Sequence, residues 1–311
     1  MTLTDRTEWP LYPAFKPLTL EDRAFLHERL WAYRPEVSEM NFTNLFIWNA
    51  QRPVTWTLLD GALILRCCSQ SGGYFYQPFE EDRPRADLVR RILEDSTAAG
   101  EADPRIARAD RRLIEALGAA PDLEITPDRD NFDYVYRTED LATLAGRRYH
   151  SKRNHIARCR ELYPHLNYRP LTPADLPACL DMACRWCQMK RCDEDLSLLE
   201  EIWAVRAALT YFTELGLDGA LIELDGQVEA FTIGELLNPT MTLIHIEKAN
   251  AEIPGLYTLI NQSYAANRWA GVSETINREQ DLGHEGLRRA KESYYPVRMV
   301  EKFTIRLKNR E

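Results

Sequence analysis

Apolar residues in the second half of the chain follow two different spacings. Runs with apolar residues at every second position predict strands, and runs with apolar residues three and four positions apart predict helices. The predicted strands are 166–170, 218–224, 227–237, 240–248, 273–278 and 298–308. The predicted helices are 173–190, 197–215, 255–269 and 282–294. This order of elements indicates a mixed α/β (α+β) fold, with helices flanking a mixed sheet.

Two short patterns occur in both halves of the chain in the same order. Residues 15–22 (FKPLTLED) resemble residues 168–175 (YRPLTPAD), and each reads as a strand that ends in a threonine able to cap the next helix. Residues 58–61 and 223–226 both place Leu-Asp-Gly between apolar runs, a strong hairpin signal. We therefore expect two related domains, 1–145 and 146–311, with the second carrying most of the site. Helices are also predicted at 86–98 and 104–118.

The charge of the chain is unevenly distributed. Thirty-nine basic against 48 acidic residues give a net charge of −9, which argues against a general nucleic-acid binder. Residues 147–160, however, hold six Lys or Arg and no acid. Such a segment indicates a defined anionic ligand, although a solvated helix face is the alternative. The chain shows no membrane-spanning run and no signal peptide, so we expect a cytoplasmic location.

Four of the seven cysteines have a spacing that fits either a metal cluster or a helix. Cys179, Cys184, Cys187 and Cys192 read C-x4-C-x2-C-x4-C, and the first three match a ferredoxin spacing. The intervening residues favour an amphipathic helix with reduced, partly buried thiols instead. We expect no metal site, and a redox or metal protein is the alternative.

The predicted strand at 240–248 carries a histidine and a carboxylate two positions apart. Alternation places His245 and Glu247 on one face, and Ile244, Ile246 and Lys248 on the other. Burying an imidazole and a carboxylate is costly unless they have a partner or a purpose. His245 or Glu247 is therefore the candidate general base or ligand of a substrate amine, with a structural hydrogen-bond network as the alternative.

Polar residues also follow the predicted strand at 273–278, where open α/β sheets collect ligand-binding groups. The substrate-binding candidates are Asn277, Arg278, Glu279, Asp281, Arg288 and Lys291. On the following helix, His284, Arg288 and Lys291 form a basic stripe, which could equally be a solvated surface. Leu287, Ala290 and Tyr294 form the opposite, apolar face.

Several blocks resemble the DUF2156 family, which is related to the C-terminal catalytic domain of phosphatidylglycerol lysyltransferase. They are 149–154 (YHSKRN), 245–249 (HIEKA), 255–261 (GLYTLIN), 276–283 (INREQDLG) and 286–296 (GLRRAKESYYP). The element order also resembles the GCN5-related N-acetyltransferase (GNAT) fold. The resemblance implies two tandem GNAT-like domains, akin to the Fem-type transferases that use charged tRNA. It also makes Tyr294, or Tyr295, a candidate general acid.

The turn before residue 256 departs from GNAT enzymes that use coenzyme A. These usually carry a glycine-rich turn there, whereas residues 248–255 contain one glycine and the acidic Glu252. A carboxylate would repel a pyrophosphate, so acyl-CoA is disfavoured relative to charged tRNA. The expected donor-phosphate ligands are Arg148, Lys152, Arg153 and Asn154, which suit a tRNA acceptor end or an anionic lipid headgroup.

We therefore expect an enzyme that transfers an acyl or aminoacyl group from charged tRNA or acyl-CoA to an amine or hydroxyl. No tightly bound cofactor is expected, because the donor is a co-substrate. The acceptor is expected to be a small molecule or lipid-like. A non-catalytic GNAT-like module that binds an anionic ligand is the alternative.

Overall fold

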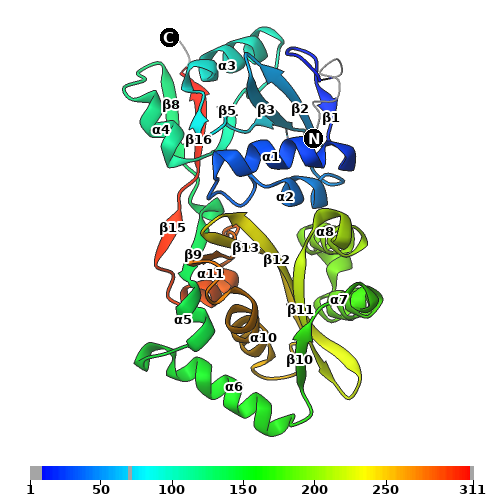
Figure 1. Cartoon of the computed structure of the whole chain (residues 1–311). Coiled ribbons are helices and arrows are strands. Elements are labelled where there is room, and N and C mark those ends of the chain that lie inside the picture. The colour runs from blue at the N-terminus through cyan, green and yellow to red at the C-terminus, as the bar shows by residue number, and fades with distance from the viewer. Residues whose placement is uncertain (1–8, 69–71, 309–311) are drawn as a thin grey trace. The chain divides into compact units, whose positions relative to one another are not determined.

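The computed structural model describes residues 9–68 and 72–308 and divides into two compact units (Figure 1). Unit 1 contains the chain up to Phe132 and again from Val300, and unit 2 is Asp133–Met299. Each unit contains a mixed sheet flanked by helices, so the expected α/β class is confirmed.

Unit 2 is built on the sheet β10-β11-β12-β13-β14-β9-β15. Its strands are β9 (Asp133–Arg137), β10 (Asn167–Pro170), β11 (Asp218–Leu224), β12 (Gln227–Asn238), β13 (Met241–Ala249), β14 (Thr275–Asn277) and β15 (Arg298–Val300). Its helices are α5 (Thr138–Thr143), α6 (His150–Leu162), α7 (Leu176–Lys190), α8 (Leu196–Thr210), α9 (Phe212–Leu215), α10 (Leu256–Tyr264) and α11 (Glu285–Glu292). The strand and helix predictions for this half therefore largely hold, although 298–308 forms two short strands, β15 and β16 (Phe303–Leu307), instead of one.

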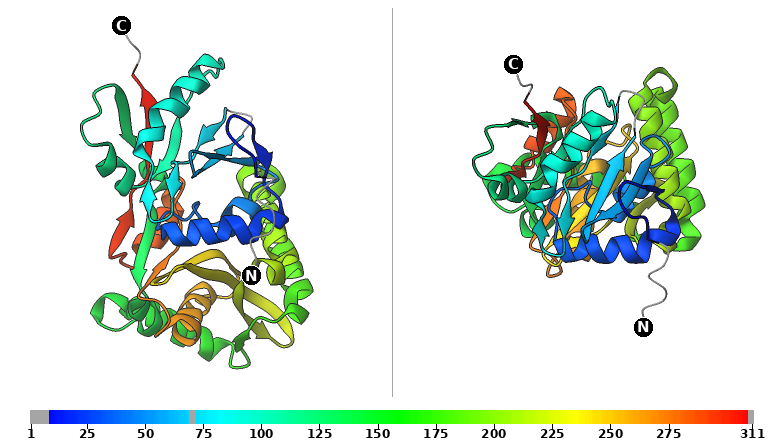
Figure 2. Two further views of the ribbon diagram at one scale, coloured as in Figure 1. Left: turned by 45° about the horizontal axis from the view of Figure 1, so that its top comes forward. Right: turned by 90° about the horizontal axis from the view of Figure 1, so that it is seen from above.

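Helices cover both faces of the unit 2 sheet. Helices α7 and α8 lie side by side in both views, and α7 packs on β12 and β13 (Figures 1 and 2). Helix α10 packs on the same two strands from the opposite face, where Glu247 meets Asn261 of α10 while Lys248 meets Glu201 of α8. Neighbouring residues of β13 therefore contact helices on opposite faces of the sheet, as strand alternation requires.

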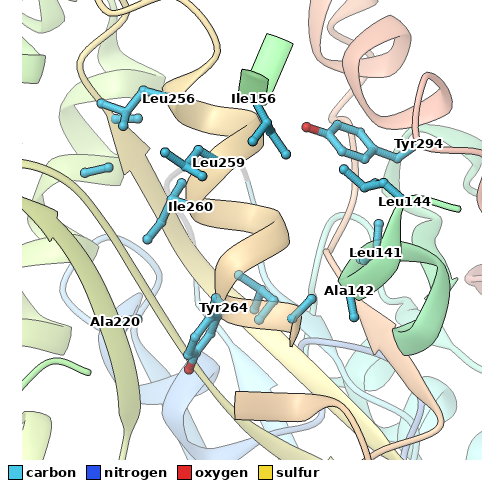
Figure 3. Close-up of a cluster of buried hydrophobic side chains, with 14 of the residues drawn as sticks. Leu141, Ala142, Leu144, Ile156, Ala220, Leu256, Leu259, Ile260, Tyr264 and Tyr294 are labelled. Carbon is cyan, nitrogen blue, oxygen red and sulfur yellow. The ribbon is translucent and has the colours of Figure 1, made fainter. Parts of the chain in front are cut away.

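Apolar side chains of α10 and α6 close the core of unit 2 on one face of the sheet. Figure 3 shows Ile156 of α6 beside Leu259 of α10, with Tyr294 directed toward the same helix. Gly255, which precedes α10, has a φ of +87°, and a Cβ there would lie 2.4 Å from the carbonyl oxygen of His155. Glycine is therefore required at position 255 for α6 and α10 to approach each other this closely.

Unit 1 is built on the sheet β1-β2-β3-β4-β7-β16-β8, with β5 and β6 pairing beside β3. Its strands are β1 (Lys16–Pro17), β2 (Val54–Leu59), β3 (Ala62–Cys67), β4 (Tyr74–Phe75), β5 (Phe79–Glu80), β6 (Arg83–Pro84), β7 (Ile106–Ala109), β8 (Leu123–Pro127) and β16 (Phe303–Leu307). Its helices are α1 (Arg23–Tyr33), α2 (Phe42–Ile47), α3 (Val89–Ala98) and α4 (Arg111–Leu117).

Each sheet includes one strand from the other half of the sequence. Strand β16, at the end of the chain, lies between β7 and β8 in unit 1. Strand β9, from the middle of the chain, lies between β14 and β15 in unit 2. The observed units consequently divide after Phe132 and again after Met299, whereas the sequence placed one boundary near residue 145.

The predicted helix at 104–118 is wrong in its first part. Residues Ile106–Ala109 form strand β7, and the helix begins only at Arg111. Arg108 has a left-handed φ of 59°, and the Asp110 side chain accepts a hydrogen bond from the backbone N–H of Leu113. A left-handed residue followed by an N-cap ends a strand and starts a helix, so one continuous helix is impossible here.

The local signals repeated in both halves are confirmed. Thr19 with Asp22, and Thr172 with Asp175, form capping boxes ahead of α1 and α7, respectively. Asp60-Gly61 and Asp225-Gly226 connect β2 to β3 and β11 to β12, and all four residues have positive φ. This is the backbone conformation of the tight hairpin turn that the Asp-Gly pairs predicted.

Candidate active site

The polar groups of unit 2 gather where β13 and β14 separate. The two strands pair in parallel only from Met241/Thr275 to Leu243/Asn277, after which β14 ends and β13 continues to Ala249. The side chains that fill this gap come from β13 itself and from the segment after β14. A gap between two parallel strands at their carboxyl ends is where α/β folds collect ligand-binding groups.

A β-bulge at His245 changes the alternation that the sequence predicted for β13. Ile233 pairs with Ile246 and Gly234 with Ile244, so His245 is the extra residue. As a result Ile244 belongs to the α10-side core rather than sharing a face with Lys248, which corrects the expected faces. Gly234 is required opposite the bulge, because a Cβ there would lie 2.5 Å from the carbonyl oxygen of Leu243.

Glu247 is the centre of a three-residue arrangement. Its Oε1 accepts a hydrogen bond from Nη2 of Arg278 at 2.8 Å, and its Oε2 accepts one from Nδ2 of Asn261 at 2.9 Å. Among the described residues, the buried Nη1 of Arg278 and Oδ1 of Asn261 find no hydrogen-bond partner. Buried polar atoms are normally paired, so a donor and an acceptor left open beside one carboxylate make this a candidate ligand position.

His245 is enclosed by two carboxylates. Its side chain is fully buried, with Nε2 3.0 Å from Glu235 Oε1 and Nδ1 3.6 Å from Glu279 Oε1. Burial alone lowers the pKa of His245, but Glu235 and Glu279 outweigh it and raise the pKa to about 9. The imidazole is therefore protonated at neutral pH and has no free lone pair for a general base.

Two lysines, Lys152 and Lys291, lie near Arg278. The Nζ of Lys152, on α6, is 3.8 Å from the ring centroid of Tyr294 and donates to Ser293 Oγ at 2.6 Å. Burial, reinforced by the Arg278 charge, lowers the pKa of Lys152 to about 8. The same two causes lower the pKa of Lys291 to about 8. Lys152 is therefore partly neutral near pH 8.

The ring of Tyr294 contacts two cations, Lys152 and Arg278. The guanidinium carbon of Arg278 is 5.0 Å from the centroid of its ring, on which Lys152 also lies. Its hydroxyl donates to Thr258 Oγ1 at 3.3 Å, and burial raises its pKa. Tyr294 therefore stays protonated at neutral pH, where it serves as a hydrogen-bond donor and a surface for cations.

Four of the candidate substrate ligands hold the loop that carries Arg278. Asn277 is fully buried and donates to Asp133 at 3.1 Å. Asp281 accepts from Tyr134 at 2.6 Å and from Arg288 at 2.9 and 3.0 Å, and these bonds outweigh burial and keep its pKa far below the usual range. Lys291 donates to the carbonyl oxygens of Arg278 and Glu279.

Helix α11 is oriented differently from the sequence expectation. Its cations Arg288 and Lys291 turn inward onto Asp281 and the loop carbonyls, while Leu287 of the supposed apolar face is 41% exposed. The reason is the buried carboxylate of Asp281, which needs a positive partner more than Leu287 needs burial. These cations position the loop rather than lining a solvated surface.

The four expected donor-phosphate ligands are separated by the structure. Lys152 points into the site, as described above. Arg148 pairs with Asp140 at 2.8 Å, and Arg153 donates to the carbonyl oxygens of Leu144 and Gly146. Asn154 is exposed and contacts only His150 among the described residues.

The turn before α10 uses its own backbone donors. The Asn250 side chain accepts from the N–H of Glu252 at 3.0 Å, and the carbonyls of Asn250 and Ile253 accept from Ile253 and Leu256 at 3.2 Å. The carbonyl oxygen of His155 also packs directly against Gly255. Few N–H groups therefore remain to cradle a pyrophosphate at this helix start.

The parallel strand pair of unit 1 is followed by a self-contained group of hydrogen bonds. Strands β4 and β7 form the parallel pair there, and beyond it Gln77 Oε1 accepts from the backbone N–H of Asp110 at 2.7 Å. Gln77 Nε2 donates to Tyr33 at 2.6 Å, and Tyr33 donates to Asp110 at 2.7 Å. Gln77, Tyr33 and Asp110 therefore satisfy one another's hydrogen bonds.

The cysteine quartet does not converge on one point. Cys187 and Cys192 form a disulfide, Cys179 is buried and Cys184 is exposed. The disulfide corrects the expectation that all thiols are reduced. Within residues 9–68 and 72–308, no group of three or more His, Cys, Asp or Glu side chains could hold a metal ion.

Two participating residues were missed by the sequence analysis. Asn261 lies within a block that carried the family resemblance, but its helical position gave no sign that it meets Glu247. Glu235 is a nearly buried carboxylate in the apolar strand β12, and this mismatch was a usable signal.

The fold and the site together define a mixed α/β protein with a cluster of largely buried charged side chains where two parallel strands separate. The family model described as phosphatidylglycerol lysyltransferase, C-terminal, matches residues 32–306, and the chain belongs to this family. The DUF2156 resemblance is thereby confirmed. Among curated proteins, none matches the chain significantly. No helix in the described part of the chain is long and apolar enough to cross a membrane.

Three solved structures are similar to this chain over nearly its whole length. A conserved protein of unknown function from Bacteroides thetaiotaomicron is 32% identical, with a TM-score of 0.87, over 94% of this chain and 99% of that one. The C-terminal (DUF2156) domain of a lysylphosphatidylglycerol synthetase from Agrobacterium fabrum is 13% identical (TM-score 0.65; 94% and 93% covered). L-PGS from Bacillus licheniformis is 14% identical (TM-score 0.63; 95% and 94% covered). At these identities, the last two show a shared fold.

Proposed function

We propose that this protein is an aminoacyltransferase that moves an aminoacyl group from charged tRNA to an amine or hydroxyl of a small or lipid-like acceptor. The observation that carries the proposal is the open pair of atoms beside Glu247. Asn261 Oδ1 is an acceptor and Arg278 Nη1 is a donor, and both residues hold the same carboxylate from its two oxygens.

An aminoacyl ester matches this pair of atoms. Its α-ammonium donates to Asn261 Oδ1 beside the negative charge of Glu247, and its carbonyl oxygen accepts from Arg278 Nη1. The same guanidinium then stabilises the oxyanion that develops when the carbonyl is attacked.

Lys152 is the proton carrier in this scheme. With a pKa of about 8, a useful fraction is neutral at physiological pH. Neutral Lys152 takes the proton of the acceptor N–H or O–H as the new C–N or C–O bond forms. The ester C–O bond of the donor then breaks, and Lys152 returns the proton to the leaving oxygen. Glu247 and Arg278 keep their charges throughout.

Charged tRNA is favoured over acyl-CoA as the donor. In the turn before α10 the N–H groups of Glu252, Ile253 and Leu256 are bonded within the turn, and Glu252 adds a negative charge. The carbonyl oxygen of His155 in α6 also packs against Gly255. A pyrophosphate would meet a carboxylate and packed backbone there rather than open donors. An acyl-CoA donor is therefore the second choice, and no tightly bound cofactor is part of the scheme.

We also propose that the two units are duplicated GNAT-like domains, with the boundary near residue 145 marking the fusion point of the original halves. Support comes from the repeated capping boxes, the repeated Asp-Gly hairpins and the parallel strand pair present in each sheet. In this view, β9 and β16 have been exchanged between the sheets since the duplication.

The transfer is tested with tRNA carrying radiolabelled amino acids and hydroxylamine as a general acceptor. We expect formation of the aminoacyl hydroxamate above the uncatalysed rate, and loss of this excess in Glu247→Gln. Acetyl-CoA at millimolar concentration should not raise the thermal midpoint, whereas a ligand at 100 times its Kd adds about 2.7 kcal/mol. Binding of charged tRNA without turnover for any amino acid would instead favour the non-catalytic anionic-ligand module.

A further inference from the structure

A cavity lies in unit 2 at the C-terminal end of α6. Its volume is about 190 Å³, and it is lined by Arg160, Tyr163, Pro164, Leu166, Tyr168, Ile222, Leu259 and Ser263. Typical pockets for drug-sized ligands are about 300–1,000 Å³, so this one suits a single planar ring. None of its lining residues takes part in the site around Glu247.

The lining combines flat apolar surface with one cation. Tyr163 and Tyr168 are half-buried and pack against the core of unit 2, while Arg160 is exposed at the rim. Aromatic side chains offer stacking surfaces to nucleic-acid bases, and arginine binds phosphate in a bidentate manner. The chemistry of the cavity therefore suits a base with its phosphate.

The cations of α6 and the turn before it extend this surface toward the active site. Arg147, Arg148, Arg153, Arg158 and Arg160 are all exposed, and the acid Glu161 appears only in the last turn of α6. The inward residues of the helix, Ile156 and Cys159, are buried. Helix α6 consequently presents arginines to solvent along its length, which is the charge pattern that a phosphate backbone requires.

Helix α6 also sets the distance between the cavity and the site. Lys152 contacts Ser293 and Tyr294 at the site, and Arg160 lies at the cavity eight residues later. Eight residues of α-helix span about 12 Å. A stacked strand advances about 3.4 Å per nucleotide, so three or four nucleotides cover this distance.

We propose that α6 and this cavity bind the single-stranded end of an RNA, with the base of a nucleotide three or four positions before the reactive end against Tyr163 and Tyr168 and its phosphate on Arg160. The inference rests on the proposed function for the identity of the reacting end. The cavity then fixes the register in which that end reaches Lys152.

The test uses uncharged RNA, so that binding is measured apart from transfer. The probe is a fluorescent RNA hairpin with four unpaired nucleotides at its 3′ end, titrated by fluorescence anisotropy at several salt concentrations. We expect Tyr163→Leu to weaken binding about ten-fold or more and Tyr163→Phe to retain it, because stacking needs the ring and not the hydroxyl. Arg160→Gln should weaken binding and lower the salt slope by about one.

The control variant is Arg206→Gln, which removes an exposed arginine from α8 and should leave binding unchanged. Circular dichroism melts verify that each variant is folded. Equal affinity for a blunt hairpin, or wild-type affinity of both Tyr163→Leu and Arg160→Gln, would overturn the proposal. The proposal would also be overturned if Tyr163→Leu and Arg160→Gln kept wild-type RNA binding but no longer floated with anionic phospholipid vesicles. That result would make the surface a lipid site.

Transfer assays on the same variants separate this inference from the proposed function. If the wild-type protein binds RNA in a way that depends on Tyr163 but shows no transfer, the proposed transferase function is rejected and the cavity proposal remains supported. Transfer from charged tRNA that is insensitive to Tyr163→Leu and Arg160→Gln removes the cavity assignment and leaves the transferase supported.

Discussion

Glu247 and Arg278 lie 31 positions apart in sequence, yet their side chains meet at 2.8 Å in the gap between β13 and β14. The pairing is partly buried, with side-chain exposures of 13% and 14%. Because both charged groups are largely shielded from water, each is stabilised mainly by the opposite charge of the other. The open Nη1 of Arg278 and Oδ1 of Asn261 are therefore held in place beside a fixed carboxylate.

Glu247→Gln should abolish most of the transfer activity. The substitution keeps the size of the side chain but removes the charge that balances the substrate ammonium and orients Arg278. We expect the rate to fall about 100-fold or more, the scale seen when one preorganised polar group is removed from an active site. The measurement is the initial rate of aminoacyl hydroxamate formation.

The matched control is Glu201→Gln, which removes the partner of buried Lys248 on the opposite face of the sheet, where the two lie 2.6 Å apart. It costs an ion pair in which the lysine is 3% exposed and the glutamate 39% exposed, and it touches no site residue. If Glu201→Gln lowered the rate as much as Glu247→Gln, the effect would reflect stability and not the site.

His245 should make the protein less stable as the pH rises above 6.5. Its folded pKa of about 9 lies above the unfolded value of 6.5, so the folded state binds the extra proton between these two values. The contribution is complete below pH 6.5 and is lost as the pH rises through 9, at most about 3 kcal/mol. Lys152 and Lys291, with pKa values lowered to about 8, act in the opposite direction above pH 8.

The comparison between wild type and His245→Gln isolates the histidine from the two lysines. Their difference in free energy of unfolding, measured in urea from pH 6 to pH 9.5, should shrink as the pH rises. A difference that stays constant over this range would show that His245 is not held as the imidazolium.

Gly255→Ala should destabilise the protein far more than Gly271→Ala. Both glycines have positive φ, +87° and +77°, so each substitution carries the backbone strain of about 1 kcal/mol. Only at Gly255 does the new Cβ meet a neighbour, the carbonyl oxygen of His155 at 2.4 Å, while nothing lies within 4 Å at Gly271. We expect an additional loss of about 1–3 kcal/mol from overpacking, measured by urea unfolding.

Similar stability of the two glycine variants would mean that α6 can move away from α10 at little cost. In that case the turn before α10 would also be open to phosphate, and the argument against acyl-CoA would weaken.

The fragments 1–145 and 146–311 should not fold separately. The first lacks β16, which joins β7 to β8, and the second lacks β9, which joins β14 to β15. Each sheet would be interrupted in its interior, with unpaired backbone groups on both sides. We expect co-expressed fragments to assemble, measured by co-purification through a tag on one of them, whereas cooperative unfolding of either fragment alone would contradict this.

Local structure was accessible from the sequence wherever neighbouring residues determine it. The capping pairs Thr19–Asp22 and Thr172–Asp175 and the Asp-Gly hairpins act over two to four positions, and all are present. The helix at 104–118 failed because Ile106–Ala109 pairs with β4 and β16, and such long-range pairing overrides local helical spacing.

Site composition was also partly accessible, because charged and aromatic residues in apolar elements are conspicuous. His245, Glu247, Arg278, Lys152 and Tyr294 were all candidates, and the structure brings them together in unit 2. Their roles were not accessible. The imidazolium state of His245 depends on Glu235 and Glu279, which come from two other segments of the chain.

The sequence by itself determined most element types, the repeated turns and the family, since these follow from short-range spacing and from recognisable blocks. The tertiary structure decided which strand entered which sheet, how the bulge at His245 turned β13, and which charges faced one another. These outcomes depend on burial and on partners distant along the chain: a carboxylate such as Asp281 draws Arg288 inward only once both are removed from water.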